Sequence, residues 1–291
     1  MALANDFPER EAPTIQESTK STMRHPLSIG SNLLRLLTIL VYLFLYLPIV
    51  VIVIMSFYPG EYMTFPLPSV SLKWYAQFFQ DKLLIQSVLN SLVLGFTAAL
   101  LSALIGTPCA IGLVRTNFPG KKIFNTLVLA PMIIPQIILG ISLLILLNTI
   151  HLPRGWAYLV IGHVMLTLPY IIVTVSSQLY GFNREVEEAA LSLGANQIQT
   201  FFEVTLPLIA PSIFAGMLFA FTVSFQEFVA TQAWATPGTA TLPIRVYGRI
   251  RDALTPEVNV VGVLMVALAF AVVILVQIFN RKEQEGGSNG A

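Results

Sequence analysis

The sequence is poor in charged residues, histidine and cysteine, and these shortages exclude several classes of protein. Only 11% of the 291 residues are charged, and there are three histidines and one cysteine, Cys109. One cysteine cannot form a disulfide framework, and its apolar surroundings are typical of a small buried side chain. The formal net charge of +1 comes with basic residues scattered over termini and loops, which provide no cationic face for nucleic acid.

Nucleotide-binding and catalytic motifs are also missing. The sequence contains no G-x-x-x-x-G-K-[ST] phosphate loop, so this chain has no such means of cradling ATP. It contains no H-E-x-x-H, and its G-x-S-x-G match, 286–290, lies in the polar C-terminal tail outside the predicted spans, which argues against an intramembrane hydrolase. His163 has no carboxylate or second histidine at metal-ligand spacing, so we name no metal site. The sequence therefore predicts a chain without catalytic residues or a cofactor of its own.

Long apolar segments are abundant, because 55% of the residues are hydrophobic, more than a soluble domain hides from water. A helix needs about 20 apolar residues to cross the hydrocarbon core. Six segments meet this requirement: 33–57, 85–114, 123–150, 156–178, 210–233 and 258–280. We therefore predict an all-α membrane protein with six transmembrane helices. Its membrane domain, 33–280, follows a disordered tail, 1–32, and precedes a second tail, 281–291.

The basic residues indicate how the spans are oriented. Placing both termini in the cytoplasm puts ten of the 16 lysines and arginines on the cytoplasmic side, in line with the positive-inside rule. This orientation also places the polar segment 181–207 in the cytoplasm. Arg245, Arg249 and Arg251 fall in an outer loop, against the general trend.

The segment 181–207 has the pattern of a compact helical loop. Gly194 would cost a continuous helix about 1 kcal/mol relative to alanine, so we predict two helices joined by a turn. We expect the second helix, 197–204, to end at Leu206 and Pro207, because proline cannot continue the hydrogen-bond ladder. Four apolar residues recur at near-helical spacing: Val186, Ala190, Leu193 and Ile198. Their face could lie on this chain's own spans or dock into a cytoplasmic partner.

The same segment contains a spaced motif. It consists of Glu188, Ala189 and Ala190, then Gly194 after three further residues, Val204 after nine more, and Leu206 with Pro207. This motif resembles the EAA loop of permease subunits in binding-protein-dependent ABC importers, with valine where isoleucine is usual. In that family the loop forms coupling helices that sit in a groove of the ATP-binding subunit. The resemblance implies that the motif couples this chain to a separate ATPase, which binds ATP and Mg.

Further stretches resemble the spermidine/putrescine-type permeases of that family: 124–144, 219–231 and 237–259. The resemblance extends over residues 85–280 and implies the type I ABC importer permease fold in a bacterial inner membrane. The implied partners are a second permease subunit, two ATP-binding subunits and a periplasmic solute-binding protein. The second permease is expected to be a homologous heterodimer mate, and an identical copy is the alternative. The implied cargo is a small cationic solute, polyamine-like or derived from an amino acid.

Glu227 is the only acidic residue that we place inside a predicted span, where a charge costs about 2.5–3.5 kcal/mol on insertion scales. On a continuous helix, Ser224 and Thr231 would share its face. The resemblance implies a cation-stabilising carboxylate on the solute path, and the alternative is a structural pairing or a protonated side chain. Gln136 follows Pro135 in another span, where the resemblance implies a glutamate. This neutral amide leaves a monocationic, zwitterionic or anionic solute open.

The outer arginines, Arg245, Arg249 and Arg251, lie in a stretch that belongs, in that family, to a loop near the entry from the binding protein. The resemblance implies that they contact an acidic docking surface. The competing hypothesis is a secondary transporter driven by an ion gradient. Such a carrier would need intramembrane carboxylates or broken-helix ion sites in both halves of an internal repeat. The sequence has one such carboxylate and no convincing repeat, so it favours the ATP-driven importer.

Overall fold

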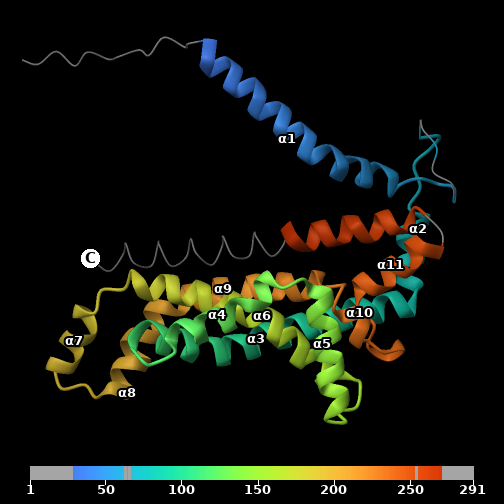
Figure 1. Ribbon diagram of the computed structural model, residues 1–291. Helices are drawn as coiled ribbons and strands as arrows, with labels where there is room; N and C mark the ends of the chain where they lie inside the picture. Colours follow the sequence, from blue (N-terminus) through green and yellow to red (C-terminus); the bar gives the residue numbers. More distant parts are fainter. Residues whose placement is uncertain (1–28, 62–63, 65–66, 253–254, 271–291) are drawn as a thin grey trace, which may run out of the picture. The chain divides into compact units, whose positions relative to one another are not determined.

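The computed structural model describes residues 29–61, 64, 67–252 and 255–270, and the regular structure in this part of the chain is entirely helical (Figure 1). The predicted all-α class is therefore confirmed. The elements are α1 (Ile29–Met55), α2 (Lys73–Gln80), α3 (Lys82–Arg115), α4 (Lys121–Ile133), α5 (Gln136–Thr149), α6 (Trp156–Tyr180), α7 (Glu185–Ser192), α8 (Gln197–Thr200), the π-helical turn η1 (Phe201–Thr205), α9 (Leu206–Gln226), α10 (Thr231–Trp234), the 3-10 turn η2 (Pro237–Thr239) and α11 (Leu242–Asp252). An apolar helix, Glu257–Phe270, follows α11.

Three of the long helices coincide with predicted spans. α1, α3 and α6 contain 27, 34 and 25 residues and cover the segments 33–57, 85–114 and 156–178 almost completely. The helix Glu257–Phe270 begins the sixth predicted segment, whose remainder lies outside the described residues. Most of the predicted tail 1–32, and the whole of 281–291, also lie outside them. α1 is apolar along most of its length, which suits a helix that crosses a membrane.

The core of the bundle consists of α3, α6 and α9, which run side by side (Figure 1). Lipid tails are as apolar as leucine, so helices in a bilayer associate through close packing rather than through the hydrophobic effect. α3 provides this packing with a buried face of small residues: Gly95, Ala98, Ala99, Ser102, Ala103, Gly106 and Ala110. A Cβ added at Gly106 would lie 2.8 Å from Cγ2 of Ile171, so α6 approaches α3 too closely for a larger residue.

The predicted span 123–150 is not one straight helix. α4 and α5 meet at a break formed by Ile134 and Pro135, and the two helices are bent by 111°. Proline has no N–H and disfavours the helical conformation in the residue before it, and Ile134 is accordingly extended, with φ −74° and ψ 133°. Unpaired backbone groups are costly in lipid, so a break of this kind needs protein or water around it.

The predicted span 210–233 is wrong at both ends. The apolar helix runs from Gln197 to Gln226, and it is followed by a non-helical segment, 227–230, and by the short α10. Apolar residues continue beyond the end of the helix because some of them pack inside the protein: Ala230 and Trp234 are fully buried in the same apolar cluster as Tyr158. An apolar composition therefore does not mark where this helix ends.

The two ends of the bundle carry different elements. Figure 1 shows α7 and α8 projecting from one end of the helices α3, α6 and α9, with α2 and α11 at the other end. The segment 181–207 and the arginines of α11 therefore lie at opposite ends of the spans, as the predicted topology requires.

Gly162 in α6 provides a test of the packing around α10. A Cβ at this position would lie 2.3 Å from Cζ3 of the fully buried Trp234. Overpacking of this kind costs about 1–3 kcal/mol, so we expect Gly162→Ala to lower the Tm of the detergent-purified protein, followed by tryptophan fluorescence. Gly112→Ala in α3 is the control, because nothing lies within 4 Å of its added Cβ and alanine favours a helix. Equal Tm values for the two variants would contradict the close contact.

Candidate coupling loop and solute pathway

The segment 181–207 begins with two short helices joined by a tight turn, which confirms the predicted helix–turn–helix. α7 ends at Ser192, and Gly194 follows in the left-handed conformation with φ +94°. The N–H of Ala195 donates to the carbonyl of Ala190 (3.1 Å), and the N–H of Gly194 donates to that of Leu191 (3.0 Å). These two bonds form a Schellman motif, whose left-handed residue is usually glycine. Nothing lies within 4 Å of an added Cβ, so backbone conformation alone selects glycine here.

α8 begins with a capping box. The side chain of Asn196 accepts a hydrogen bond from the N–H of Gln199, and the side chain of Gln199 accepts one from the N–H of Asn196, each at 2.9 Å. This arrangement satisfies backbone donors that the start of a helix leaves unpaired. The turn between α7 and α8 is thus fixed on both sides, by the Schellman motif and by the capping box.

The expected helix end at Leu206 and Pro207 is wrong. The helix continues from α8 into α9 through η1, where the N–H of Leu206 donates to the carbonyl of Phe201. This wider turn shifts the hydrogen-bond register by one residue, at the point where Pro207 contributes no donor. The segment is therefore continuous with a helix of 30 residues, Gln197–Gln226.

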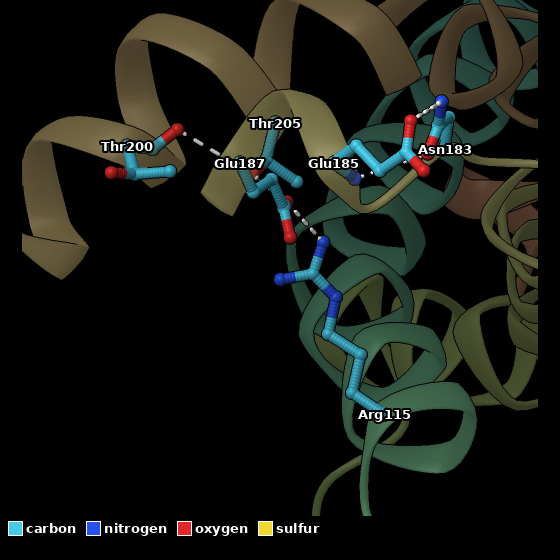
Figure 2. Close-up of polar contacts among 6 residues, drawn as sticks. All are labelled: Arg115, Asn183, Glu185, Glu187, Thr200 and Thr205. Atoms are coloured by element: carbon cyan, nitrogen blue, oxygen red, sulfur yellow. Dashed lines mark hydrogen bonds and ion pairs between the residues drawn. The ribbon is translucent and has the colours of Figure 1, made fainter. Parts of the chain in front are cut away.

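The inner side of the segment is bound to α3 through Glu187 (Figure 2). Its Oε1 lies 2.5 Å from Nη2 of Arg115, the last residue of α3, and also accepts a hydrogen bond from the hydroxyl of Thr205 in η1. One carboxylate therefore joins α3, α7 and the π-helical turn. Sequence reasoning missed this contact. The only available signals were an acidic residue directly before the EAA-like motif and a basic residue at the end of a predicted span.

The outer side of the segment is uncovered in the described part of the chain. Leu193 is 90% exposed and Ile198 is 71% exposed, so the apolar face predicted from their spacing does not pack on the described helices. Glu188 and Ala189 are also exposed, and the carboxylate of Glu188 forms no hydrogen bond or ion pair with any described residue. Among the remaining motif residues Pro207 is exposed, and three are half-buried: Ala190, Val204 and Leu206.

Two of the predicted pathway residues, Ser224 and Thr231, do not share a helix face, because α9 ends at Gln226. His163 of α6 nevertheless brings them together. Its Nδ1 lies 2.7 Å from Oγ of Ser224, and its Nε2 lies 3.0 Å from Oγ1 of Thr231. The imidazole is fully buried, and both of its nitrogens contact hydroxyl groups. His163 therefore joins α6, α9 and α10.

Glu227 lies at the C-terminal end of α9 rather than inside a helix, and its side chain is buried. Its Oε1 accepts a hydrogen bond from the N–H of Ala230 at 2.5 Å, so the carboxylate stabilises the turn that leads to α10. Its Oε2 has no hydrogen-bond partner within the described ranges. One oxygen is thus used by the backbone, and the other is available to a further group.

The two interrupted spans are in direct contact. Nε1 of Trp234 in α10 donates to the carbonyl of Gly140 in α5 at 2.8 Å, and a Cβ added at Gly140 would lie 2.9 Å from Cα of Ala230. The helix after the proline break therefore packs against the segment that follows α9. Gln136 is exposed at the start of α5 whereas Glu227 is buried, so the structure does not bring these two predicted pathway residues together.

A hollow of about 1010 Å³ lies beside the start of α4 and the end of α6. Its polar lining includes Lys121, Lys122, Ser176 and Ser177. α4 itself has no buried residue. This side of the bundle is therefore open in the single chain.

The three arginines of α11 differ in their contacts. Arg249 forms ion pairs with Asp81 and Glu257, so its charge is compensated within the chain. Arg245 is half-buried, and its Nε has no hydrogen-bond partner among the residues that the structure describes. Arg251 is exposed. Of the three, Arg251 presents its side chain most freely to another protein.

Asp81 anchors α3 at the α11 end of the bundle. Its Oδ1 accepts a hydrogen bond from the N–H of Leu84 at 2.9 Å, as the N-cap of α3, and its Oδ2 pairs with Arg249. Partial burial raises the pKa of Asp81, but the N–H of Leu84 and the charge of Arg249 outweigh this effect and hold the pKa below its ordinary value. The folded protein therefore favours the ionised form.

These features define the class of the protein: a multi-span membrane permease of the type I fold, with interrupted spans and a projecting helical loop. The chain belongs to the family described as binding-protein-dependent transport system inner membrane component, whose match covers residues 102–284. The resemblance inferred from the EAA-like motif is thereby confirmed. Members of this family are non-catalytic permease components of the inner membrane.

Individual relatives support the same assignment. The chain is 34% identical over 242 residues to the spermidine/putrescine transport system permease protein PotC of Haemophilus influenzae, covering 83% of this chain and 94% of that protein. It is 35% identical over 229 residues to the putrescine transport system permease protein PotI of Escherichia coli strain K12, covering 76% and 81%. A bacterial ABC transporter involved in the import of the acidic polysaccharide alginate shares the fold, with a TM-score of 0.67, 19% identity and coverage of 88% and 96%.

Two variants of Asp81 separate its charge from its capping role. Asp81→Asn keeps an acceptor for the N–H of Leu84 but loses the charge facing Arg249, and a partly exposed pair of this kind contributes about 0.2–1 kcal/mol. Asp81→Ala also loses the cap, which adds about 1 kcal/mol. We expect the alanine variant to have the lower Tm of the two. Because the pKa of Asp81 is lowered, the stability advantage of the wild type over Asp81→Asn should be complete above the unfolded pKa and should disappear as the pH falls through the folded pKa. A constant difference in Tm across this range would contradict the charge contribution.

Proposed function

We propose that this chain is one permease subunit of an ATP-driven importer and that it passes a small cationic solute of the polyamine class from a periplasmic binding protein to the cytoplasm. The chain would bind no cofactor itself, because ATP and Mg would be held by two separate ATP-binding subunits. The observation that carries this proposal is the form of residues 181–207, the coupling loop. Its outer face is apolar and exposed, while its inner face is fixed to the spans.

The coupling loop suits docking into a groove of another subunit. Leu193, the C-cap of α7, and Ile198 in α8 are exposed, and the turn between the two short helices is fixed by capping hydrogen bonds. Helix-in-groove recognition depends on apolar anchors of this kind on a preformed helical surface. Glu188 would add a charged contact at the same surface, since its side chain is exposed and forms no hydrogen bond or ion pair with any described residue. The spacing of the EAA-like motif and the membership of the family support an ATP-binding subunit as the partner.

The solute path would pass the contact between the two interrupted spans. A buried carboxylate in a membrane protein favours a cationic group nearby, and Oε2 of Glu227 is available for one. Ser224 and Thr231 would act there mainly through His163, which positions both hydroxyls. The two relatives are named for the transport of spermidine/putrescine and of putrescine, which supports a polyamine as the cargo. Gln136 would contribute a neutral amide at the exposed start of α5.

A second permease subunit, a homologous heterodimer mate, would complete the path. The hollow beside α4 and α6 and the exposed surface of α4 are open in the single chain, and a mate could cover them. With both termini in the cytoplasm, α11 would face the periplasm. Arg251 and Arg245 would then contact an acidic surface of the binding protein, while Arg249 would hold α11 in place through Asp81 and Glu257.

The alternative is a secondary transporter driven by an ion gradient, and one observation favours it: the two interrupted spans touch, as they do in such carriers. Energy depletion separates the two functions. Cells that contain the complete transport system should lose uptake of radiolabelled spermidine and putrescine when ATP is depleted while the membrane potential is maintained. Uptake that persists without ATP, but stops when the potential is collapsed, would favour the secondary transporter.

Two substitutions at Gly194 test the coupling loop. The structure has space for an asparagine or a valine side chain at this position. A non-glycine residue in the left-handed conformation costs about 1–2 kcal/mol, but asparagine adopts this conformation more readily than the β-branched valine. We expect Gly194→Val to reduce the ATP hydrolysis that solute-loaded binding protein stimulates, and Gly194→Asn to retain more of it. Co-purification of all subunits is the control for assembly. Equal stimulation in the wild type and both variants would contradict a coupling role for this turn.

A further inference from the structure

We propose that Glu187 is a positioning residue of the transporter, which fastens the coupling loop to the end of α3 so that a movement of the loop is transmitted to α3 as well as to α9. This inference rests on the proposed function, and it concerns a carboxylate outside the residues of the EAA-like motif. It adds a second mechanical connection between the loop and the membrane helices.

The chain itself provides only part of the connection. The coupling loop continues without a break through α8 and η1 into α9, so α9 must follow a movement of α8. At its other end the loop follows α6 through the non-helical residues 181–184. α3 has no direct chain connection to the loop, so it can follow the loop only through noncovalent contacts.

Glu187 supplies such a contact (Figure 2). Arg115, the last residue of α3, extends its guanidinium to Oε1 of Glu187 at 2.5 Å. Thr205 is buried, and its hydroxyl donates to the same carboxylate oxygen, whereas the carbonyl of Thr200 is 3.5 Å away. A hydroxyl has one proton, so the nearer and charged acceptor takes it. The carboxylate therefore fixes the π-helical turn and the end of α3 to the same point on α7.

The pair is also shielded from solvent. The side chains of Arg115 and Glu187 are 27% and 13% exposed. Fully exposed ion pairs contribute little because water and salt screen them, and partial burial reduces that screening. Because α3 packs on α6 and α9 through small residues, a displacement of its end would reach the core of the bundle.

The neighbouring carboxylates of α7 show that Glu187 is distinguished by its position. Glu185, Glu187 and Glu188 all lie in the first turn of α7, where negative charge favours the helix in the same way. Glu185 interacts only within the loop, with the side chain of Asn183 at 3.1 Å. The side chain of Glu188 forms no hydrogen bond or ion pair with any described residue. Glu187 alone of the three reaches α3, so Glu185→Gln is a matched control for Glu187→Gln.

The test uses the whole complex, with its ATP-binding subunits and binding protein, in proteoliposomes. The measured quantity is the number of spermidine or putrescine molecules taken up per ATP hydrolysed. Glu187→Gln keeps the size of the side chain but removes its charge, and we expect this ratio to fall roughly fivefold or more, the scale of a typical coupling between sites. Glu185→Gln should keep the wild-type ratio. The subunit composition of each complex is checked by co-purification.

A distance measurement separates positioning from a general loss of stability. Nitroxide labels on Asn117 and Ser192, both exposed, report the separation of the end of α3 from α7, with Cys109→Ser as the background. In the wild type and in Glu185→Gln the distance distribution should be narrow and equal with and without trapped nucleotide. In Glu187→Gln it should broaden. A wild-type distance that changes between the nucleotide states would overturn the proposal.

Charge exchange completes the test. Arg115→Glu and Glu187→Arg should each lower the ratio of solute to ATP, and the double variant should recover much of it and narrow the distance distribution again. If the Glu187→Gln complex does not assemble, the double variant is the deciding test. Recovery of the solute-to-ATP ratio supports the proposal, and a broad distance distribution in an assembled complex overturns it. A wild-type ratio in Glu187→Gln would also overturn it, while leaving the importer function intact. Absence of ATP-dependent uptake in the wild type would instead count against the proposed function.

Discussion

The packing of α3 against α6 and α9 is the contact on which the other features of the molecule depend. In a bilayer the hydrophobic effect does not drive these helices together, so their association depends on close van der Waals packing. Small residues such as Gly106 and Ala110 permit this packing. The same helix is held at both ends by ion pairs, through Asp81 to Arg249 and through Arg115 to Glu187. α3 therefore connects the coupling loop, the core and the α11 end in one element.

The interruptions of the spans obey a second constraint, which is that backbone groups in a membrane need partners. The break after α9 packs against α5 inside the protein, where the indole of Trp234 reaches the carbonyl of Gly140, whereas Ile134 and Pro135 at the break before α5 are exposed in the single chain. The carboxylate of Glu227 accepts a backbone N–H in the turn after α9, and His163 holds the hydroxyls on both sides of that turn. Irregular backbone at membrane depth is tolerated where protein surrounds it in this way. Glu227, Ser224 and Thr231, which the sequence assigned to the solute path, therefore also stabilise the chain at the break after α9.

The sequence predicted features that depend on local chemistry and missed those that depend on distant contacts. Gly194 predicted a turn because its left-handed backbone conformation by itself favours glycine. The long apolar segments predicted α1, α3 and α6 because a helix in lipid needs apolar side chains over its whole length. The end of α9 could not be predicted, since the residues that follow it include apolar ones, such as Ala230 and Trp234, that pack inside the protein. Pro207 indicated a helix end because the proline rule assumes a fixed hydrogen-bond register, which η1 changes. The pair Arg115–Glu187 joins residues 72 positions apart, and no periodicity encodes it.

The length of the helix Gln197–Gln226 suggests how the loop and the solute path would act together. Thirty residues of helix extend about 45 Å, so one element begins in the coupling loop and ends beside Glu227. A force on α8 would reach Ser224 and, through His163, would reach α6 and α10 as well. Near the start of this helix the hydroxyl of Thr205 is held by Glu187, which also holds α3. α3 and α9 are joined at the loop and packed along their length, so a movement of the loop would tilt both helices together. The contact between the two interrupted spans would then be the place where this tilt changes access to the solute path.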